Sequence, residues 1–161
     1  MRLWRSTRSK HRQRVDEFLG RLKPPRWGDQ VLRVGWSGRE QSFGGIRLNI
    51  QPVPGVQVVA DATQMPFKDN TFDYVSCIEM AYLVWDRAQL CRELWRVLKP
   101  GGRLVVTEPN AHLRPQDDEW GSRVDPRWWT VNPVELHPFC TWNTGYGIVM
   151  EKSGSAVDGE A

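Results

Sequence analysis

Two apolar segments joined by a clearly marked helix constrain the fold of this chain more than any other feature. The segments DYVSCI (73–78) and RLVVTE (103–108) carry continuous apolar runs, which is typical of parallel strands buried on both faces of a sheet. Between them, Asp86 is a suitable helix N-cap with Gln89 as its capping-box partner, and KPGG (99–102) ends the helix. A strand–helix–strand unit of this kind predicts two parallel strands joined by a crossover.

The chain before this unit predicts further elements of the same sheet. Apolar runs at 31–34, 45–50 and 56–60 predict three more strands. A helix is predicted at about 9–22 from the helical spacing of its apolar residues, Val15, Phe18, Leu19 and Leu22. We therefore predict an α/β fold with a doubly wound, mostly parallel sheet.

The chain after residue 110 carries weaker signals. Residues 111–130 have neither helical nor strand periodicity, which predicts a long loop that could cover a site as a lid. Within it, Trp128-Trp129 either packs the lid or stacks on a substrate. Asn132 and Pro133 match the start of a helix, and residues 145–152 predict a last strand.

Positive charge is concentrated at one end of the chain. Residues 1–26 hold nine Lys or Arg against two acidic residues, a net charge of +7, whereas the whole chain carries +3. We divide the chain into a basic N-terminal arm and helix (1–26), one domain (27–152) and a flexible tail (153–161). The arm is either a solvated helix and tail or a contact for nucleic acid, anionic lipid or an acidic partner.

Several classes of protein are excluded by what the sequence lacks. No run approaches the roughly 20 apolar residues of a membrane span, and the N-terminus has no secretory signal. There is no phosphate-binding loop and no nucleophile elbow, and the widely spaced histidines predict no metal site. The cysteines fit neither a disulfide framework nor a zinc site, which predicts a reducing, cytoplasmic location; they are Cys77, Cys91 and Cys140.

A set of mostly glycine and polar residues lies at or just after the carboxyl ends of the predicted strands, at the edge where open parallel sheets bind ligands. In chain order they are Gly35, Gly38, Asn49, Asp61, Ala62, Cys77, Glu79 and Glu108. The glycines permit close backbone approach. Asn49 suits a ribose hydroxyl, and Asp61 suits an exocyclic amine. The set predicts a site for a nucleoside-like ligand.

Residues 30–110 resemble the class I S-adenosylmethionine-dependent methyltransferases. The similarity lies in VVADATQMPF (58–67), NTFDYV (70–75) and RELWRVLKPGGRLVV (92–106), at the spacing of the family. The resemblance implies a Rossmann-like methyltransferase fold, with S-adenosylmethionine as cofactor and S-adenosylhomocysteine as product.

The resemblance also implies cofactor-binding roles for particular residues. The adenine would contact the Asp61 carboxylate and the Ala62 backbone, and Asn49 would hold the ribose. The methionine moiety would lie between Gly35 and Gly38, and Cys77 also belongs to the implied cofactor-binding set. From the residues alone, Asp61 is alternatively the cap of the turn before Met65, and Asn49 is alternatively a loop hydrogen bonder without a ligand.

The glycine loop departs from the family pattern. Gly35 and Asn49 are only 14 positions apart, whereas about 20 residues commonly separate such groups. This resembles a compact branch, the type 11-like methyltransferases, in which a short loop replaces a helix. Arg33 stands where Asp or Asn is usual, Trp36 stands at a small-residue position, and Asn49 replaces a carboxylate. The lost charge-assisted hydrogen bond, worth about 1.5–3 kcal/mol, implies weakened cofactor binding.

Three residues are candidates for catalytic roles by the same resemblance. Glu79 follows the fourth strand near the methyl-donor end, and Glu108 and His112 follow the fifth, where relatives shape the acceptor pocket. Glu79 is alternatively a solvated carboxylate. Methyl transfer needs a base only for a protic acceptor, because positioning supplies most of the rate.

Two functions remain open from the sequence. One is a methyltransferase that acts on O or N of a small molecule or glycan. The other is a catalytically degenerate methyltransferase-fold protein that serves as a binding or regulatory partner, in contact with another protein or as a homodimer. No base-methylation motif is present, because EPN (108–110) is not one, so we do not expect a nucleic-acid acceptor.

Overall fold

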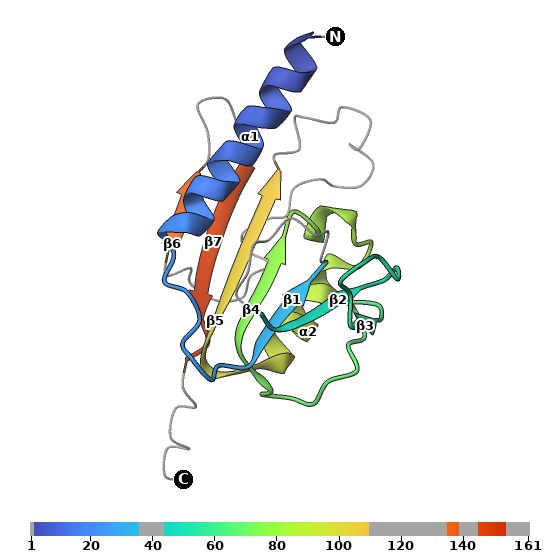
Figure 1. Cartoon of the computed structure of the whole chain (residues 1–161). Coiled ribbons are helices and arrows are strands. Elements are labelled where there is room, and N and C mark those ends of the chain that lie inside the picture. The colour runs from blue at the N-terminus through green and yellow to red at the C-terminus, as the bar shows by residue number, and fades with distance from the viewer. Residues whose placement is uncertain (1, 36–43, 110–134, 139–144, 154–161) are drawn as a thin grey trace.

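The computed structural model describes residues 2–35, 44–109, 135–138 and 145–153 (Figure 1). These residues form a seven-stranded sheet in the order β3-β2-β1-β4-β5-β7-β6. The strands are β1 (Val31–Val34), β2 (Ile46–Asn49), β3 (Val58–Val59), β4 (Phe72–Ile78), β5 (Leu98–Pro109), β6 (Glu135–Pro138) and β7 (Gly145–Glu151). The helices are α1 (Arg2–Arg21), the short 3-10 helix η1 (Ala81–Leu83) and α2 (Arg87–Val97).

The strand directions confirm the predicted α/β fold with a mostly parallel sheet. β3, β2, β1, β4 and β5 pair in parallel, and β7 is antiparallel to its two neighbours, β5 and β6. The chain builds outward from β1 to β3, then returns to the other side of β1 to form β4 and β5. The strand order therefore reverses between β1 and β4, the place where such sheets bind ligands.

The two faces of the sheet have separate cores. Alternation along β1 sends Leu32 and Val34 to the face covered by α2, whereas Val31 packs with Val15 and Phe18 of α1 on the other face. In Figure 1, α1 runs along the strands on the β5–β7–β6 side of the sheet. The α2 core is the larger one because it collects apolar side chains from five strands and from α2 itself.

Most of the predicted elements are present, with one error. The N-cap is confirmed, since the Asp86 side chain accepts a hydrogen bond from the Gln89 amide. The helix predicted to start near Asn132 is wrong from Glu135 onward, where the chain forms β6 and pairs with β7. A local helix-start signal was overridden there by the sheet edge. The predicted lid (111–130), its tryptophans and residues 154–161 lie outside the described residues, and the three-part division of the chain stays a prediction.

The sheet has short connections on one side. Residues 50–57 and 60–71, which join β2 to β3 and β3 to β4, are fully described and contain no helix. None of the helices in the described ranges is long and apolar enough to cross a membrane. The chain that directly follows β2 and β3 is therefore built from turns.

We expect a methyl group at Gly147 to loosen α1. A Cβ atom there would lie 2.4 Å from Cε1 of the buried Phe18 ring, so Gly147→Ala should lower the free energy of unfolding by about 1–3 kcal/mol through overpacking. Gly20→Ala is the matched control, because its Cβ would meet nothing within 4 Å and should be neutral or slightly stabilising. Urea unfolding of both variants measures this; equal stabilities would contradict the packing.

Candidate functional site

The carboxyl ends of β1, β2 and β4 are joined directly around Gly35. The Gly35 amide donates to the Leu48 carbonyl at 2.9 Å. Gly35 has φ +78°, and a Cβ atom there would lie 2.3 Å from Met80 Cγ. Only glycine therefore allows Met80 to pack against the end of β1. Gly38 and Trp36 lie outside the described residues.

Arg33 holds the returning end of the loop after β1. Its side chain is buried, and Nε donates to the Gly44 carbonyl at 3.0 Å. The substitution that departs from the family pattern thus contacts the same loop that the usual Asp or Asn would orient. Its charge lies on the α1 face of the sheet, because the alternate residues Leu32 and Val34 face α2.

Asp61 forms a turn with one of its two carboxylate oxygens. Oδ1 accepts from the Thr63 amide at 2.8 Å and from the Thr63 hydroxyl at 2.7 Å. These bonds, the amide first, lower the pKa of the exposed Asp61 carboxyl below its ordinary value. Oδ2 accepts no hydrogen bond from the residues that the structure describes. The predicted cap is therefore present, and the exposed carboxylate has one oxygen that the described residues do not use.

Asn49 lies beside Asp61 at the edge of the sheet. Its Oδ1 accepts from the Gln51 amide at 3.0 Å, and its carbonyl accepts from the Ala60 amide at 3.0 Å. Ile50, which sequence reasoning did not single out, has 67% of its surface exposed here. An apolar residue directly after a strand-end polar residue was the signal that could have identified it.

Ala62 and Cys77 are placed differently from the polar candidates. Both side chains are buried in the core beneath α2, and Cys77 is fully inaccessible between Val34 and Val106. Any contact of Cys77 with a ligand would therefore come from its backbone. The structure brings Gly35, Asn49 and Asp61 together at one edge and leaves the Cys77 thiol inside.

Glu79 occupies a strained backbone position where β4 ends. It has φ +53°, an uncommon conformation for a residue other than glycine. Its amide donates to the Thr107 carbonyl at 2.8 Å and to the Thr107 hydroxyl at 3.2 Å. Strain of this kind costs about 1–3 kcal/mol and is concentrated at functional sites.

Glu108 is fully buried, and both of its oxygens are used. Oε1 accepts from the Ala81 amide at 2.9 Å and Oε2 from the Tyr82 amide at 3.0 Å. Burial, and next the nearby Glu79 carboxylate, raise the pKa of Glu108 well above its ordinary value. The buried Arg87 opposes this shift, and its guanidinium donates to the Tyr82 carbonyl at 3.1 Å. His112 lies outside the described residues.

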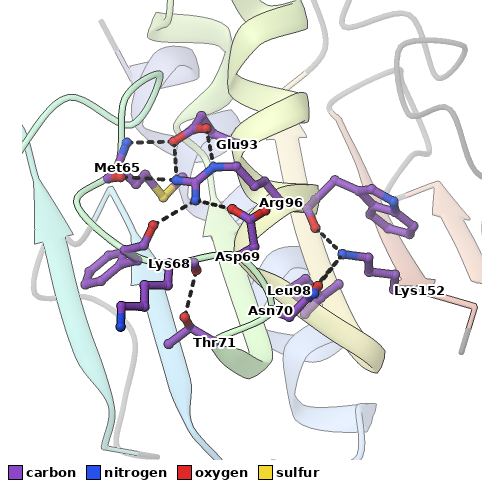
Figure 2. A network of polar contacts seen from close by, with 11 residues as sticks. Met65, Lys68, Asp69, Asn70, Thr71, Glu93, Arg96, Leu98 and Lys152 are labelled. Atoms are coloured by element: carbon purple, nitrogen blue, oxygen red, sulfur yellow. Dashed lines mark hydrogen bonds and ion pairs between the residues drawn. The ribbon is translucent and has the colours of Figure 1, made fainter. Parts of the chain in front are cut away.

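A network of polar contacts fastens the loop after Asp61 to α2 (Figure 2). Glu93 Oε2 accepts from the Met65 amide at 2.7 Å, and the Arg96 guanidinium binds Glu93 at 2.6 Å and Asp69 at 2.9 Å. Arg96 also donates to the Phe67 and Met65 carbonyls at 2.7 and 3.2 Å. The motif RELWR thus supports the loop that carries Asp61, a role that sequence reasoning missed.

A second contact in Figure 2 ties the end of β7 to the same region. Lys152 Nζ donates to the Trp95 and Leu98 carbonyls at 2.8 and 2.7 Å and to Asn70 Oδ1 at 3.0 Å. The ammonium thereby satisfies carbonyl groups at the end of α2. Among the described residues, no group of three or more His, Cys, Asp or Glu could hold a metal ion.

Replacing Arg96 should release the loop. Arg96→Lys retains the charge but loses the fork that reaches two carbonyls and two carboxylates, so the free energy of unfolding should fall by roughly 1–3 kcal/mol. Arg92→Lys is the matched control on the exposed side of α2, where Arg92 contacts only Gln89 among the described residues. Urea unfolding of the two variants measures the difference, and similar values would contradict the network.

Glu108 should give the stability of the protein a pH dependence. The unfolded carboxyl titrates near 4.3, so above that pH the folded state retains a proton that the unfolded chain has released, and stability falls as pH rises. Glu108→Gln loses one accepted hydrogen bond, so its free energy of unfolding near pH 5 should be about 1–3 kcal/mol below that of the parent protein. This difference between variant and parent should narrow toward pH 9. Urea unfolding across this range measures it; a constant deficit would contradict the raised pKa.

Comparisons with known proteins agree with this arrangement. Residues 30–106 match the family model described as a methyltransferase domain. A demethylmenaquinone methyltransferase of Streptomyces avermitilis is 43% identical over 68 residues, which are 42% of this chain and 29% of that protein. The ubiquinone/menaquinone biosynthesis C-methyltransferase UbiE of Klebsiella pneumoniae is 46% identical over 90 residues, which are 55% of this chain and 33% of that protein. The chain thus spans about a third or less of the length of these relatives.

Solved structures share the fold at lower sequence identity. A chain from the complex that contains the Haloferax volcanii Trm112 methyltransferase activator superposes with a TM-score of 0.68 and 15% identity, covering 92% of this chain and 93% of that one. At this identity the likeness concerns the fold alone. The family match, the three motifs and the strand order together assign residues 30–106 to the methyltransferase domain family, with a Rossmann-like α/β fold.

Proposed function

We propose that this chain binds S-adenosylmethionine at the carboxyl edge of β1, β2 and β3 and transfers its methyl group to a small molecule. One observation carries the proposal: the free Oδ2 of Asp61 stands beside Asn49 and the exposed Ile50, while Gly35 closes the end of β1. An anionic acceptor, an amide and an apolar side chain match an adenosine group.

The residues fit the cofactor in the following way. Asp61 Oδ2 would accept from the adenine amine, Asn49 would hold the ribose hydroxyls, and the Gly35 backbone would lie along the methionine part, with Ala62 contributing its backbone. The bound cofactor supplies an activated methyl group on a sulfonium. The chain has to hold donor and acceptor in line and exclude water.

The two glutamates would contribute differently. Glu108 is poorly suited to accept a substrate proton because both oxygens already accept backbone hydrogen bonds. Glu79, half-buried at the strained end of β4, is the better candidate for a base if the acceptor is protic. His112 stays a candidate from the sequence alone.

The acceptor is proposed as oxygen or nitrogen of a small molecule or glycan. The relatives named as ubiquinone/menaquinone biosynthesis C-methyltransferases make a carbon the alternative acceptor atom. The degenerate reading, in which Arg33, Trp36 and Asn49 abolish cofactor binding, makes the chain a partner of another protein or a homodimer. A protein partner is equally compatible with an active enzyme, since one structural neighbour comes from a complex that contains a methyltransferase activator.

Calorimetric titration with S-adenosylhomocysteine tests the cofactor. One-to-one binding is expected, and Asp61→Ala should weaken it by about tenfold to a hundredfold, since it removes a hydrogen bond to a charged group. Thr63→Val is the matched control: it removes the hydroxyl that binds Asp61 Oδ1 but keeps the carboxylate. It should cost affinity by less than about threefold, because the Thr63 amide bond remains.

Two results would contradict the proposal. Equal losses in Asp61→Ala and Thr63→Val would mean that Asp61 acts only through its turn. Failure of the folded parent protein to bind at millimolar ligand would favour the degenerate alternative.

A further inference from the structure

The segment MAYLVW (80–85) is apolar, and the core accounts for only part of it: Ala81 is buried, and Met80 and Val84 pack against the α2 core. It lies between Glu79 and Asp86 and contains no charged residue. Only Ala81 is buried, whereas 58% of Leu83 and 78% of Trp85 is exposed. Large apolar side chains exposed next to one another are uncommon on a surface that binds nothing.

This segment begins at the candidate site. It directly follows the strained Glu79, and the Met80 side chain packs against Gly35 at the end of β1. Leu83 and Trp85 therefore lie a few residues from the edge where β1 and β4 end. That position borders the proposed methyl donor, which is where a methyl acceptor has to bind.

The backbone of η1 is fixed by two buried ionisable residues from different elements. Glu108 of β5 accepts from the Ala81 and Tyr82 amides, and Arg87 of α2 donates to the Tyr82 carbonyl. Tyr82 is thereby bonded through both its N–H and its C=O groups. Two ionisable side chains with less than 5% exposure bind the backbone of one turn of a 3-10 helix, which indicates that the position of this turn matters.

We propose that Leu83 and Trp85 form an apolar lip that binds a flat, neutral ring of the methyl acceptor, and that Glu108 and Arg87 are positioning residues that hold this lip. The inference rests on the proposed function, because it assigns the acceptor side of the same site. An indole and a leucine side chain offer a ring a stacking and packing surface. The Leu83 and Trp85 side chains carry no charge, so the part of the acceptor that packs on them should be a neutral ring.

Binding of 2-naphthol, a neutral bicyclic ring with one hydroxyl, tests the lip. Trp85→Ser should weaken naphthol binding to the full chain by about tenfold, and Leu83→Ser by about threefold to fivefold, through lost apolar contact. Trp27→Ser is the matched control, because Trp27 is fully exposed on the loop before β1. It should leave the naphthol dissociation constant unchanged, and all three variants should bind S-adenosylhomocysteine as the parent does.

The positioning role has its own readout. Glu108→Gln should weaken naphthol binding by about fivefold or more while changing S-adenosylhomocysteine affinity by less than about twofold. Arg87→Lys keeps a donor near the Tyr82 carbonyl, so it should retain more naphthol affinity than Arg87→Met. This pair tests the positioning role if Glu108→Gln does not fold.

Each outcome separates the two proposals. Equal naphthol affinity in Trp85→Ser and Trp27→Ser, or a parent that does not bind naphthol, would overturn the lip. Parallel losses of naphthol and S-adenosylhomocysteine in Glu108→Gln would overturn the positioning role. Naphthol binding that depends on Trp85 in a protein that does not bind S-adenosylhomocysteine would leave the lip standing and refute the proposed cofactor.

Discussion

The candidate site depends on the ion pair between Glu93 and Arg96 on α2. These two side chains face a loop that has no helix of its own, and together they bind its Met65 amide and the carbonyls of Met65 and Phe67. The Arg96 hydrogen bond lowers the pKa of Glu93, so the pair is charged and strong at neutral pH. A helix that packs beneath the sheet thereby fixes a loop at the edge where we propose that the cofactor binds.

A second pair of ionisable residues fixes the connection after β4, as Glu93 and Arg96 fix the connection after β3. Glu108 and Arg87 hold η1 from its N–H and C=O sides. Both pairs combine a residue of α2 with backbone groups of a connection that follows a strand. Because α2 spans the distance between the connections after β3 and β4, its rigidity is shared by the proposed donor and acceptor sides.

Much of this fold could be predicted from the sequence, because parallel strands buried on both faces leave a strong apolar signal. The N-cap at Asp86 could be predicted from the sequence as well, because the residue type and its spacing to Gln89 are local signals. Glu135 was misjudged because a helix cap is a local pattern, whereas β6 exists only through its pairing with β7. Glu108 was proposed as a catalytic residue, yet it continues the alternation of Leu104 and Val106, which face the α2 core. The alternation of side chains along a strand would have predicted that Glu108 is buried. Only the structure shows which backbone amides donate hydrogen bonds to its carboxyl group.

The short connections explain why the proposed ligand-binding residues also shape the chain. In a sheet with full crossovers, helices would set where each strand ends. Here Asn49 and Asp61 form local turns with the Gln51 and Thr63 amides instead. In the proposed complex each side chain would therefore divide its hydrogen-bonding capacity between the chain and the cofactor. A carboxylate suits this division better than an amide, because it has two equivalent acceptor oxygens and retains its charge after one is used. Asp61 keeps that advantage and Asn49 lacks it, so most of the proposed electrostatic recognition of the cofactor would come from the connection after β3.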